Sequence, residues 1–257
     1  MPYRIDAAPS TAPPTRRERL REQSRAEIKS AARGQLVNNG PAGIQLRAVA
    51  RDVGLTAPAL YRYFPSLEDL IESVTVDLFA ELCDAMEAAA TAATDPFDRM
   101  LALSRGFRGW AMEHPHEFGL LFAIAPTALG QQPSNACQQA SDRFGNLFAG
   151  AFIAMWNASP FPVPADDDVA GDLRAGLDPY WTWRTANVAP DMPVGAVATF
   201  LEGWVRIFGC VAMEAFGHLS WALPDGEPMF EQIMRSLASL VHRPDAYRPP
   251  APRSEVA

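Results

Sequence analysis

The sequence has few cysteines and none in a spacing that suggests a metal site or a disulfide framework. Its three cysteines, Cys83, Cys137 and Cys210, are far apart and odd in number. We therefore expect buried thiols in a reducing compartment, the cytoplasm. No uninterrupted apolar run reaches the ~20 residues needed to cross a bilayer. Residues 1–15 contain four prolines and lack the apolar segment of a signal peptide.

Signatures of catalysis and cofactor binding are also lacking. The segment His114–Glu117 does not have the H-E-x-x-H spacing of zinc proteases, and the sequence has no G-x-S-x-G motif, no glycine-rich phosphate loop and no cluster of metal ligands. Strand-like alternation of apolar and polar residues does not persist anywhere. We therefore expect an all-α protein that is not an enzyme and that holds no metal and no cofactor.

The charge is unevenly distributed along the chain. The net charge of −8 would by itself argue against a nucleic-acid partner. Residues 1–62, however, hold 11 Lys and Arg against 5 Asp and Glu, a net charge of +6, and the remaining residues carry −14. A basic N-terminal region followed by an acidic remainder predicts that one end of the protein attracts phosphate. The alternative is that the arginine-rich segment is an ordinary solvated helix face.

The stretch Ile44–Phe64 has the pattern of two short helices around a tight turn. Gly54 occupies a position where a helix ends in a left-handed residue. Thr56 is a suitable N-cap, and Pro58 falls in the first turn of the second helix, where a missing N–H has no cost. The apolar positions of the first helix follow helical spacing at Leu46, Val49, Ala50 and Val53.

Two short helices around a glycine-containing turn, with small residues, arginine and tyrosine on the outer face, are typical of a helix-turn-helix that reads DNA. The sequence LRAVARDVGLTAPALYRYFPS over residues 46–66 resembles the DNA-binding signature of the TetR family of one-component transcriptional regulators. The resemblance extends over roughly residues 25–74. Leu67 stands where the family usually has a lysine that contacts phosphate, so that contact is not expected here.

The predicted DNA contacts follow from side-chain chemistry. Arg47, near the start of its helix, has a planar guanidinium that suits guanine O6 and N7, and the family resemblance implies the same role. The other predicted contacts are thymine methyl groups for Ala57 and Pro58, phosphate for Gln45 and Thr56, and phosphate or base edges for Tyr61 and Tyr63. Arg62 is a further predicted DNA contact, at a position that can face along the groove wall. Each of these residues could instead be ordinary surface. A single reading helix makes few base contacts, so we expect two copies on a two-fold axis over a palindromic operator.

The second part of the chain predicts an interface between two copies. The last two long helices, expected over about 193–219 and 227–242, have apolar residues on more than one side, which favours burial against another subunit. An internal core position is the alternative. The segments WAMEHPHEFGLLF over residues 110–122 and Trp204-x-x-x-Phe208-Gly209 resemble the WHG-type regulatory domain of TetR proteins. That resemblance implies a helical ligand-binding domain and a dimeric four-helix bundle.

Aromatic residues are concentrated in the same part of the chain. The stripe Phe144, Phe148 and Phe152 is by itself typical of an ordinary core. Several such stripes, in a chain that resembles a ligand-responsive family, favour an apolar cavity for a hydrophobic small molecule. The residues predicted to line it are Trp110, Phe118, Phe122, Phe148, Phe152, Trp156, Tyr180 and Trp183.

We therefore expect about nine to ten helices in four segments. Residues 1–17 would form a disordered arm, 18–66 a three-helix helix-turn-helix domain, 67–243 a regulatory and dimerisation domain, and 244–257 a disordered tail. The leading hypothesis is a homodimeric, sequence-specific repressor released from its operator by a hydrophobic ligand. The alternatives are a constitutive regulator without a ligand, and a small-molecule carrier or enzyme that uses the aromatic cavity.

Overall fold

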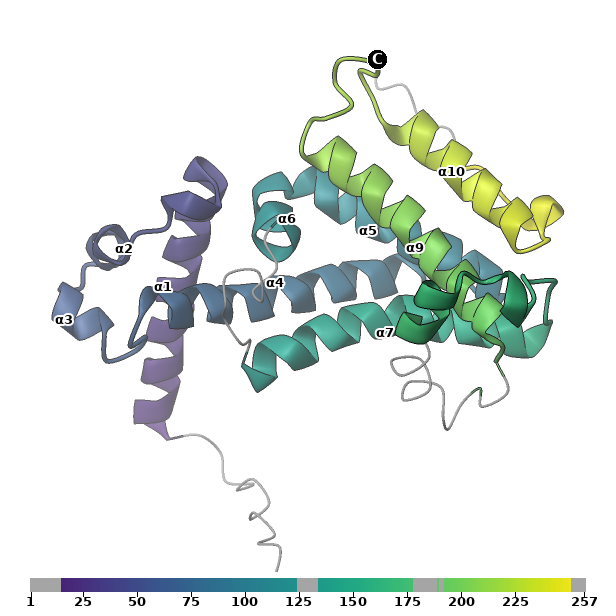
Figure 1. Cartoon of the computed structure of the whole chain (residues 1–257). Helices are drawn as coiled ribbons and strands as arrows, with labels where there is room; N and C mark the ends of the chain where they lie inside the picture. The colour runs from purple at the N-terminus through teal and green to yellow at the C-terminus, as the bar shows by residue number, and fades with distance from the viewer. Residues whose placement is uncertain (1–14, 124–133, 178–188, 190–191, 251–257) are drawn as a thin grey trace, which may run out of the picture. The chain divides into compact units, whose positions relative to one another are not determined.

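The computed structural model describes residues 15–123, 134–177, 189 and 192–250. Within these ranges the chain forms helices and turns and contains no strand, which confirms the predicted all-α fold. The chain divides into two compact units, Met1–Val74 and Thr75–Ala257 (Figure 1). The division falls inside helix α4 (Leu67–Ala89), which runs without interruption from one unit into the other.

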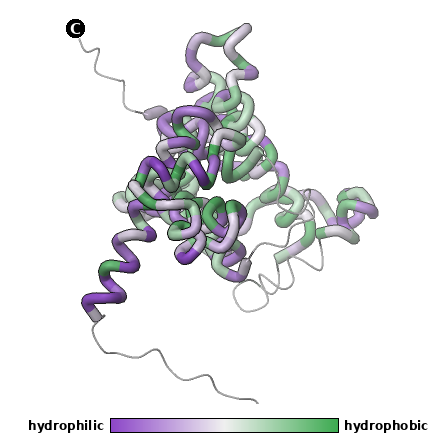
Figure 2. Tube along the Cα trace, turned by 90° about the vertical axis from the view of Figure 1, so that its left-hand side faces the viewer, coloured by the Kyte–Doolittle hydropathy of each residue, from purple (hydrophilic) through white to green (hydrophobic). Residues whose placement is uncertain are grey.

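The first unit begins with α1 (Arg16–Asn39). This helix starts before Glu18, where the sequence predicted its beginning, because Thr15 and Glu18 form a capping box. Arg16 and Arg17 therefore belong to the helix and not to a disordered arm. The first half of α1 is exposed and largely hydrophilic (Figure 2). The buried residues of α1 lie further along, at Ile28, Ala32, Gln35 and Leu36, and the helix contacts α2.

The predicted turn between the next two helices is confirmed. Helix α2 (Leu46–Asp52) ends before Gly54, which has a φ of 68°. Thr56 then caps α3 (Ala57–Leu60) by accepting a hydrogen bond from the backbone N–H of Ala59. Helix α3 is only one turn long, and the residues up to Phe64 continue as turns, whose backbone bonds to Leu60 keep Phe64 buried.

The second unit consists of helices arranged around α5 (Pro96–Glu113). This helix contacts α6 (Pro115–Phe122), α7 (Asn135–Ala158) and α9 (Val194–Ala215). Figure 1 shows α10 (Glu227–Leu240) alongside α9. Shorter helical segments are η1 (Pro41–Gly43) in the first unit and η3 (Asp166–Asp168), residues 171–177 and η4 (Pro244–Ala246) in the second.

Helices α9 and α10 end earlier than the sequence predicted. Helix α9 stops at Ala215, before Gly217 with its φ of 73°, and α10 stops at Leu240, before His242 with a φ of 56°. The predicted disordered tail also begins too early. Residues 244–250 are ordered, because the Tyr247 hydroxyl donates to Glu231 and the carbonyl of Arg248 accepts from Arg105.

Phe107 of α5 is the centre of the core of the second unit. Its side chain is fully buried and contacts aromatic rings from three other helices, at centroid separations of 5.4–6.4 Å. Aromatic pairs at such separations stabilise a core beyond the apolar area that they bury. The partners of Phe107 are Phe118, Phe122, Phe144, Phe148, Trp204 and Phe208.

Helix α9 is the one described helix that is long and apolar enough to cross a membrane by length and composition alone. We did not expect this from the sequence, because Glu202 and Arg206 interrupt its apolar run. Core helices can meet the same criterion, and α9 packs against α5 and α10.

The three cysteines are buried, as predicted. Burial raises the pKa of the Cys83 thiol to about 11, so this residue stays protonated at neutral pH.

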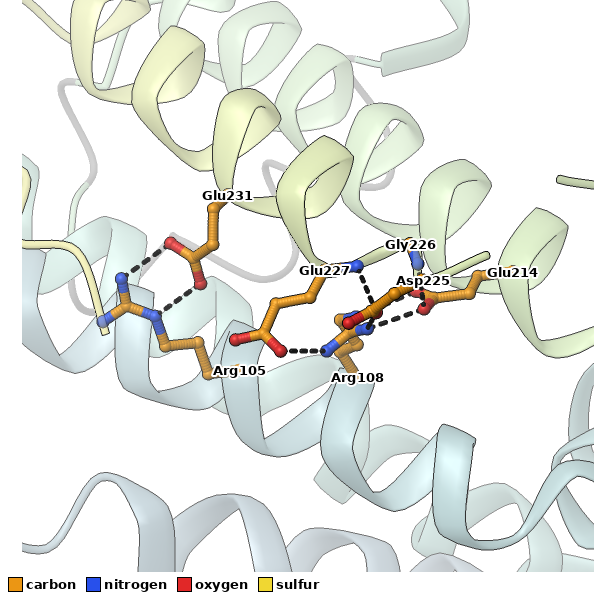
Figure 3. Close-up of polar contacts among 7 residues, drawn as sticks. All are labelled: Arg105, Arg108, Glu214, Asp225, Gly226, Glu227 and Glu231. Atoms are coloured by element: carbon orange, nitrogen blue, oxygen red, sulfur yellow. Dashed lines mark hydrogen bonds and ion pairs between the residues drawn. The ribbon is translucent and has the colours of Figure 1, made fainter. Parts of the chain in front are cut away.

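Two arginines of α5 join that helix to α9 and α10 (Figure 3). Arg105 forms a two-pronged pair with Glu231, with N–O distances of 2.9 and 2.8 Å. Arg108 is 9% exposed, and its guanidinium donates to Glu214 at the end of α9 and to Asp225 before α10. Burial opposes the charge of Glu231, but hydrogen bonds from Arg105 and Tyr247 outweigh it and hold the pKa of this carboxyl below its ordinary value.

Replacing Arg108 by methionine should destabilise the second unit strongly. The change leaves the Glu214 carboxylate buried without its main partner, which typically costs about 3–5 kcal/mol. Chemical denaturation followed by tryptophan fluorescence measures this, because all the tryptophans lie in the second unit. Arg174→Met is the matched control. Arg174 pairs with exposed aspartates, so its loss should change the free energy of unfolding by less than about 1 kcal/mol. Equal effects would contradict this assignment.

Candidate functional site

The predicted reading surface lies on α2, the turn after it and α3. Arg47 is the second residue of α2 and its side chain is exposed. Tyr61 is 50% exposed although it is aromatic. The predicted contact residues are exposed at Gln45, Arg47, Thr56, Pro58, Tyr61 and Arg62, and partly exposed at Ala57 and Tyr63. The helix-turn-helix therefore brings all eight residues to a short segment of the first unit, with their side chains at least partly open to solvent.

The two helix starts on this surface are not alike. Thr56 uses its hydroxyl to accept the N–H of Ala59, and this oxygen can still donate its own hydrogen to a phosphate. Gln45 precedes α2 without capping it, so its side chain is not engaged in the helix start. Its backbone N–H instead donates to the side chain of Gln35 at 3.0 Å. Both starts present the positive end of a helix dipole, which favours phosphate.

Arg25 is one of the arginines that the sequence placed in the basic segment before the reading helices. Its Nη1 donates to the carbonyl of Tyr63 at 2.7 Å, and its guanidinium lies 4.4 Å from the centre of the Phe64 ring. Arg25 thus holds the turn after α3 against α1 and is not free to track the DNA backbone. The arginines of α1 that are exposed are Arg16, Arg17, Arg19 and Arg21.

The second unit contains an apolar cavity of about 60 Å³ between α5, α7, α9 and α10. Its two polar lining residues are Ser104 and Thr199, and each hydroxyl donates to a carbonyl of its own helix, at Met100 and Gly195. The cavity is therefore chemically apolar. Its other lining residues are Phe97, Met100, Leu101, Phe148, Phe152, Met155, Phe200, Gly203, Trp204, Ile207, Met234, Leu237, Leu240 and Val241.

The aromatic residues predicted to line a cavity are divided by the structure. Phe148 and Phe152 line it. Trp110, Phe118, Phe122 and Trp156 do not. Trp110 packs beside His114 and donates to Glu81, Phe118 and Phe122 pack around Phe107, and Trp156 packs on Phe161. Tyr180 and Trp183 lie outside the described residues.

The contribution of α10 to the cavity was missed at the level of sequence. Met234, Leu237 and Leu240 follow helical spacing, and the sequence pattern alone favours an interface for this apolar side. Among the residues that the structure describes, no group of three or more His, Cys, Asp or Glu could hold a metal ion.

Comparison with known protein families matches two parts of the chain. Residues 28–74 match "Bacterial regulatory proteins, tetR family". Residues 100–237 match "Tetracyclin repressor-like, C-terminal domain". The first match contains the helix-turn-helix, and the second contains most of the residues that line the cavity.

Individual relatives agree with these matches. The HTH-type transcriptional regulators Rv1816 of Mycobacterium tuberculosis and Mb1846 of Mycobacterium bovis are each 33% identical to this chain over 229 residues, which cover 88% of this chain and 95% of each relative. The solved structure of the regulatory protein SCO4313 aligns with 26% identity and a TM-score of 0.67, over 88% of this chain and all of that chain. RolR, solved with its ligand resorcinol, aligns with 13% identity and a TM-score of 0.50, over 90% of this chain and 98% of that chain. These matches and the helix-turn-helix geometry show that the chain belongs to the TetR family of DNA-binding transcriptional regulators.

Proposed function

We propose that the protein is a homodimeric repressor that an apolar small molecule releases from its operator. In this proposal residues 18–66 form the DNA-binding domain and residues 67–243 the regulatory and dimerisation domain. The protein would act in the cytoplasm, where its DNA is. The observation that carries the proposal is the apolar cavity between α5, α7, α9 and α10 in a regulator whose reading helices present exposed contact residues.

The last two long helices support a dimer. Val205 of α9 is 60% exposed, and Met213 follows it at a spacing of eight residues, which places both on one side of the helix. Phe216, directly after α9, is also exposed. Gly209 lies between Val205 and Met213 with open space where a Cβ would be, so a second helix can approach closely. Trp221, between α9 and α10, is 85% exposed. Large exposed apolar side chains along one side of a helix are typical of an interface with a second copy on a two-fold axis.

The reading surface supports sequence-specific binding. In our proposal Arg47 reads a base edge, and Ala57 and Pro58 contact apolar groups in the groove. Gln45, Thr56, Tyr61, Arg62 and Tyr63 contact phosphates or base edges. The exposed arginines at the start of α1 add attraction to the DNA backbone that does not depend on sequence.

The size of the cavity supports a coupling between ligand and DNA. A volume of about 60 Å³ holds little more than two water molecules, whereas ligand pockets are typically about 300–1,000 Å³. A ligand therefore has to move the surrounding helices apart and binds a different state from the one described here. A ligand that prefers such a state shifts the population toward it, by a coupling of typically ~1–3 kcal/mol. Helix α4 is continuous from the second unit into the first and could carry this change. RolR, which has the same fold, was solved with the ligand resorcinol.

The Arg47→Ala variant tests the proposed base contact. We expect the variant to lose discrimination at one base position in each half-site, at a cost of about 1–3 kcal/mol, because its bidentate contact to the base is lost. Affinities for duplexes that differ at single positions, measured by fluorescence anisotropy at fixed salt, give this directly.

Two further variants make the Arg47 result specific. Tyr63→Phe should have a small effect that is the same for every sequence. Arg174→Ala removes a charge from the second unit and should leave discrimination unchanged. If Arg47→Ala discriminates between bases as well as the wild type does, the assignment of the contact is wrong.

The Gly203→Leu variant tests the cavity. Gly203 lines the cavity, and a Cβ there would meet Leu237 Cδ2 at an ordinary 3.7 Å, so a larger side chain can enter the cavity from this position and occupy it in place of a ligand. Small aromatic compounds (phenol, indole, resorcinol) that raise the melting temperature and weaken DNA binding of the wild type should do neither in this variant. Its DNA affinity without any compound should not change.

Gly150→Leu is the matched control, because Gly150 of α7 is exposed with nothing near its absent Cβ. It gains the same helix propensity without touching the cavity, and it should respond to the compounds as the wild type does. A compound that still releases Gly203→Leu from DNA would place the ligand site elsewhere.

A further inference from the structure

Gln35 of α1 is a buried polar residue on an otherwise apolar side of that helix. It is 8% exposed and lies seven residues after Ile28 and three after Ala32, both of which are fully buried. A buried amide is costly unless its oxygen and its nitrogen both find partners. Both atoms of the Gln35 amide do, and both partners belong to the segment of α2.

The amide bonds to the two ends of α2. Its Oε1 accepts the backbone N–H of Gln45, the residue before α2, at 3.0 Å. Its Nε2 donates to Oδ2 of Asp52, the last residue of α2, at 2.8 Å. The reversed amide would set N–H against N–H and oxygen against carboxylate, so only one orientation satisfies all the groups.

Each of these two partners gains from Gln35 a directional hydrogen bond that α2 does not supply itself. The N-cap position of α2 has no side-chain hydrogen bond of its own. Asp52 places a negative charge at the negative end of the helix dipole, which is unfavourable without compensation. Arg51 Nε lies 4.0 Å from the Asp52 carboxylate and its side chain is 80% exposed, so this ion pair contributes little.

The packing of α2 against α1 and α3 is small and apolar. The helix has seven residues, and only Val49 and Ala50 are buried. Two small apolar side chains bury little area and are not directional, and a helix of two turns is marginal in isolation. Two hydrogen bonds from one rigid amide fix the position of α2 along its axis and its rotation about that axis. Arg47 lies on the same two turns, so the direction of its side chain depends on this position and rotation of α2.

We propose that Gln35 is a positioning residue for DNA recognition: it does not touch DNA, and it holds α2 in the setting from which sequence is read. The inference rests on the proposed role of α2 in base reading. Specific contacts need a side chain placed to within a fraction of an ångström, whereas attraction to phosphates does not. Loss of the Gln35 contacts should therefore reduce specific binding far more than non-specific binding.

The first test is Gln35→Leu, which keeps the approximate volume and removes both hydrogen bonds. The probe is the duplex that the wild-type full-length protein selects from a random pool, compared with a scrambled duplex of equal length. We expect affinity for the selected duplex to fall about 10- to 100-fold, and affinity for the scrambled duplex to change less than about threefold. Gln23→Leu is the control, because the Gln23 amide bonds only to Glu27 on the exposed side of the same helix, and it should bind as the wild type does.

The second test exchanges the amide and the carboxylate between positions 35 and 52. In Gln35→Glu a carboxylate faces Asp52, so specific affinity should fall at least as far as in Gln35→Leu. Adding Asp52→Asn lets the new carboxylate accept both from the Gln45 N–H and from the new amide at position 52. This double variant should recover most of the specific affinity, because both hydrogen bonds are restored, and affinity for the scrambled duplex separates this effect from a general loss of stability.

Three results would overturn the proposal. These are wild-type affinity of Gln35→Leu for the selected duplex, an equal loss for selected and scrambled duplexes, and a double variant no better than Gln35→Glu. Failure of the proposed base contact is distinguishable. In that case Arg47→Ala would discriminate normally while Gln35→Leu would not, and the residue that depends on Gln35 would be another residue of α2.

Discussion

The attachment of α10 to α9 by packing and to α5 by side-chain contacts is the constraint on which the regulatory half depends. The first turns of α10 are joined to α5 by ion pairs, one between Arg105 and Glu231 and one between Arg108 and Asp225, which lies just before α10. Its later turns, at Met234, Leu237 and Leu240, face the cavity. One end of the helix is therefore fixed by directional pairs, and the other rests on apolar contacts that a ligand can replace. This arrangement favours movement of the later turns while the first turns stay in place.

The DNA-binding half likewise combines apolar burial with directional polar contacts. Apolar burial at Val49, Ala50 and Leu60 brings the short helices onto α1. Polar side chains of α1 then set their orientation, Arg25 at the turn after α3 and Gln35 at both ends of α2. Apolar area supplies most of the attraction, and hydrogen bonds with fixed geometry select one arrangement among several of similar burial. A surface whose side chains have to match base edges requires one defined arrangement of the short helices.

Much of the helix-turn-helix could be predicted from sequence because its turn and helix cap are determined by residues close together in the chain. Gly54, Thr56 and Pro58 each act on the backbone within a few residues, and the turn and the cap were found where expected. The cavity could not be predicted in this way. A stripe of aromatic residues has the same sequence pattern whether it fills a core or lines a cavity. In this structure Phe118 and Phe122 pack around Phe107 in the core. The role of Gln35 was equally hidden, since its partners lie ten and seventeen residues away. The available sequence signal was a polar residue, Gln35, at a helical position where the neighbouring buried residues of α1 are apolar.

The central claim is that two identical reading heads act together on DNA, under the control of an apolar ligand. The most direct measurement is selection of bound sequences from a random duplex pool by the full-length protein, repeated with the compound that most raises its melting temperature. The account predicts an inverted repeat, with half-sites about one helical turn or a multiple of it apart, whose enrichment falls when the compound is present. A single unrepeated motif, or enrichment that the bound compound does not change, would contradict it.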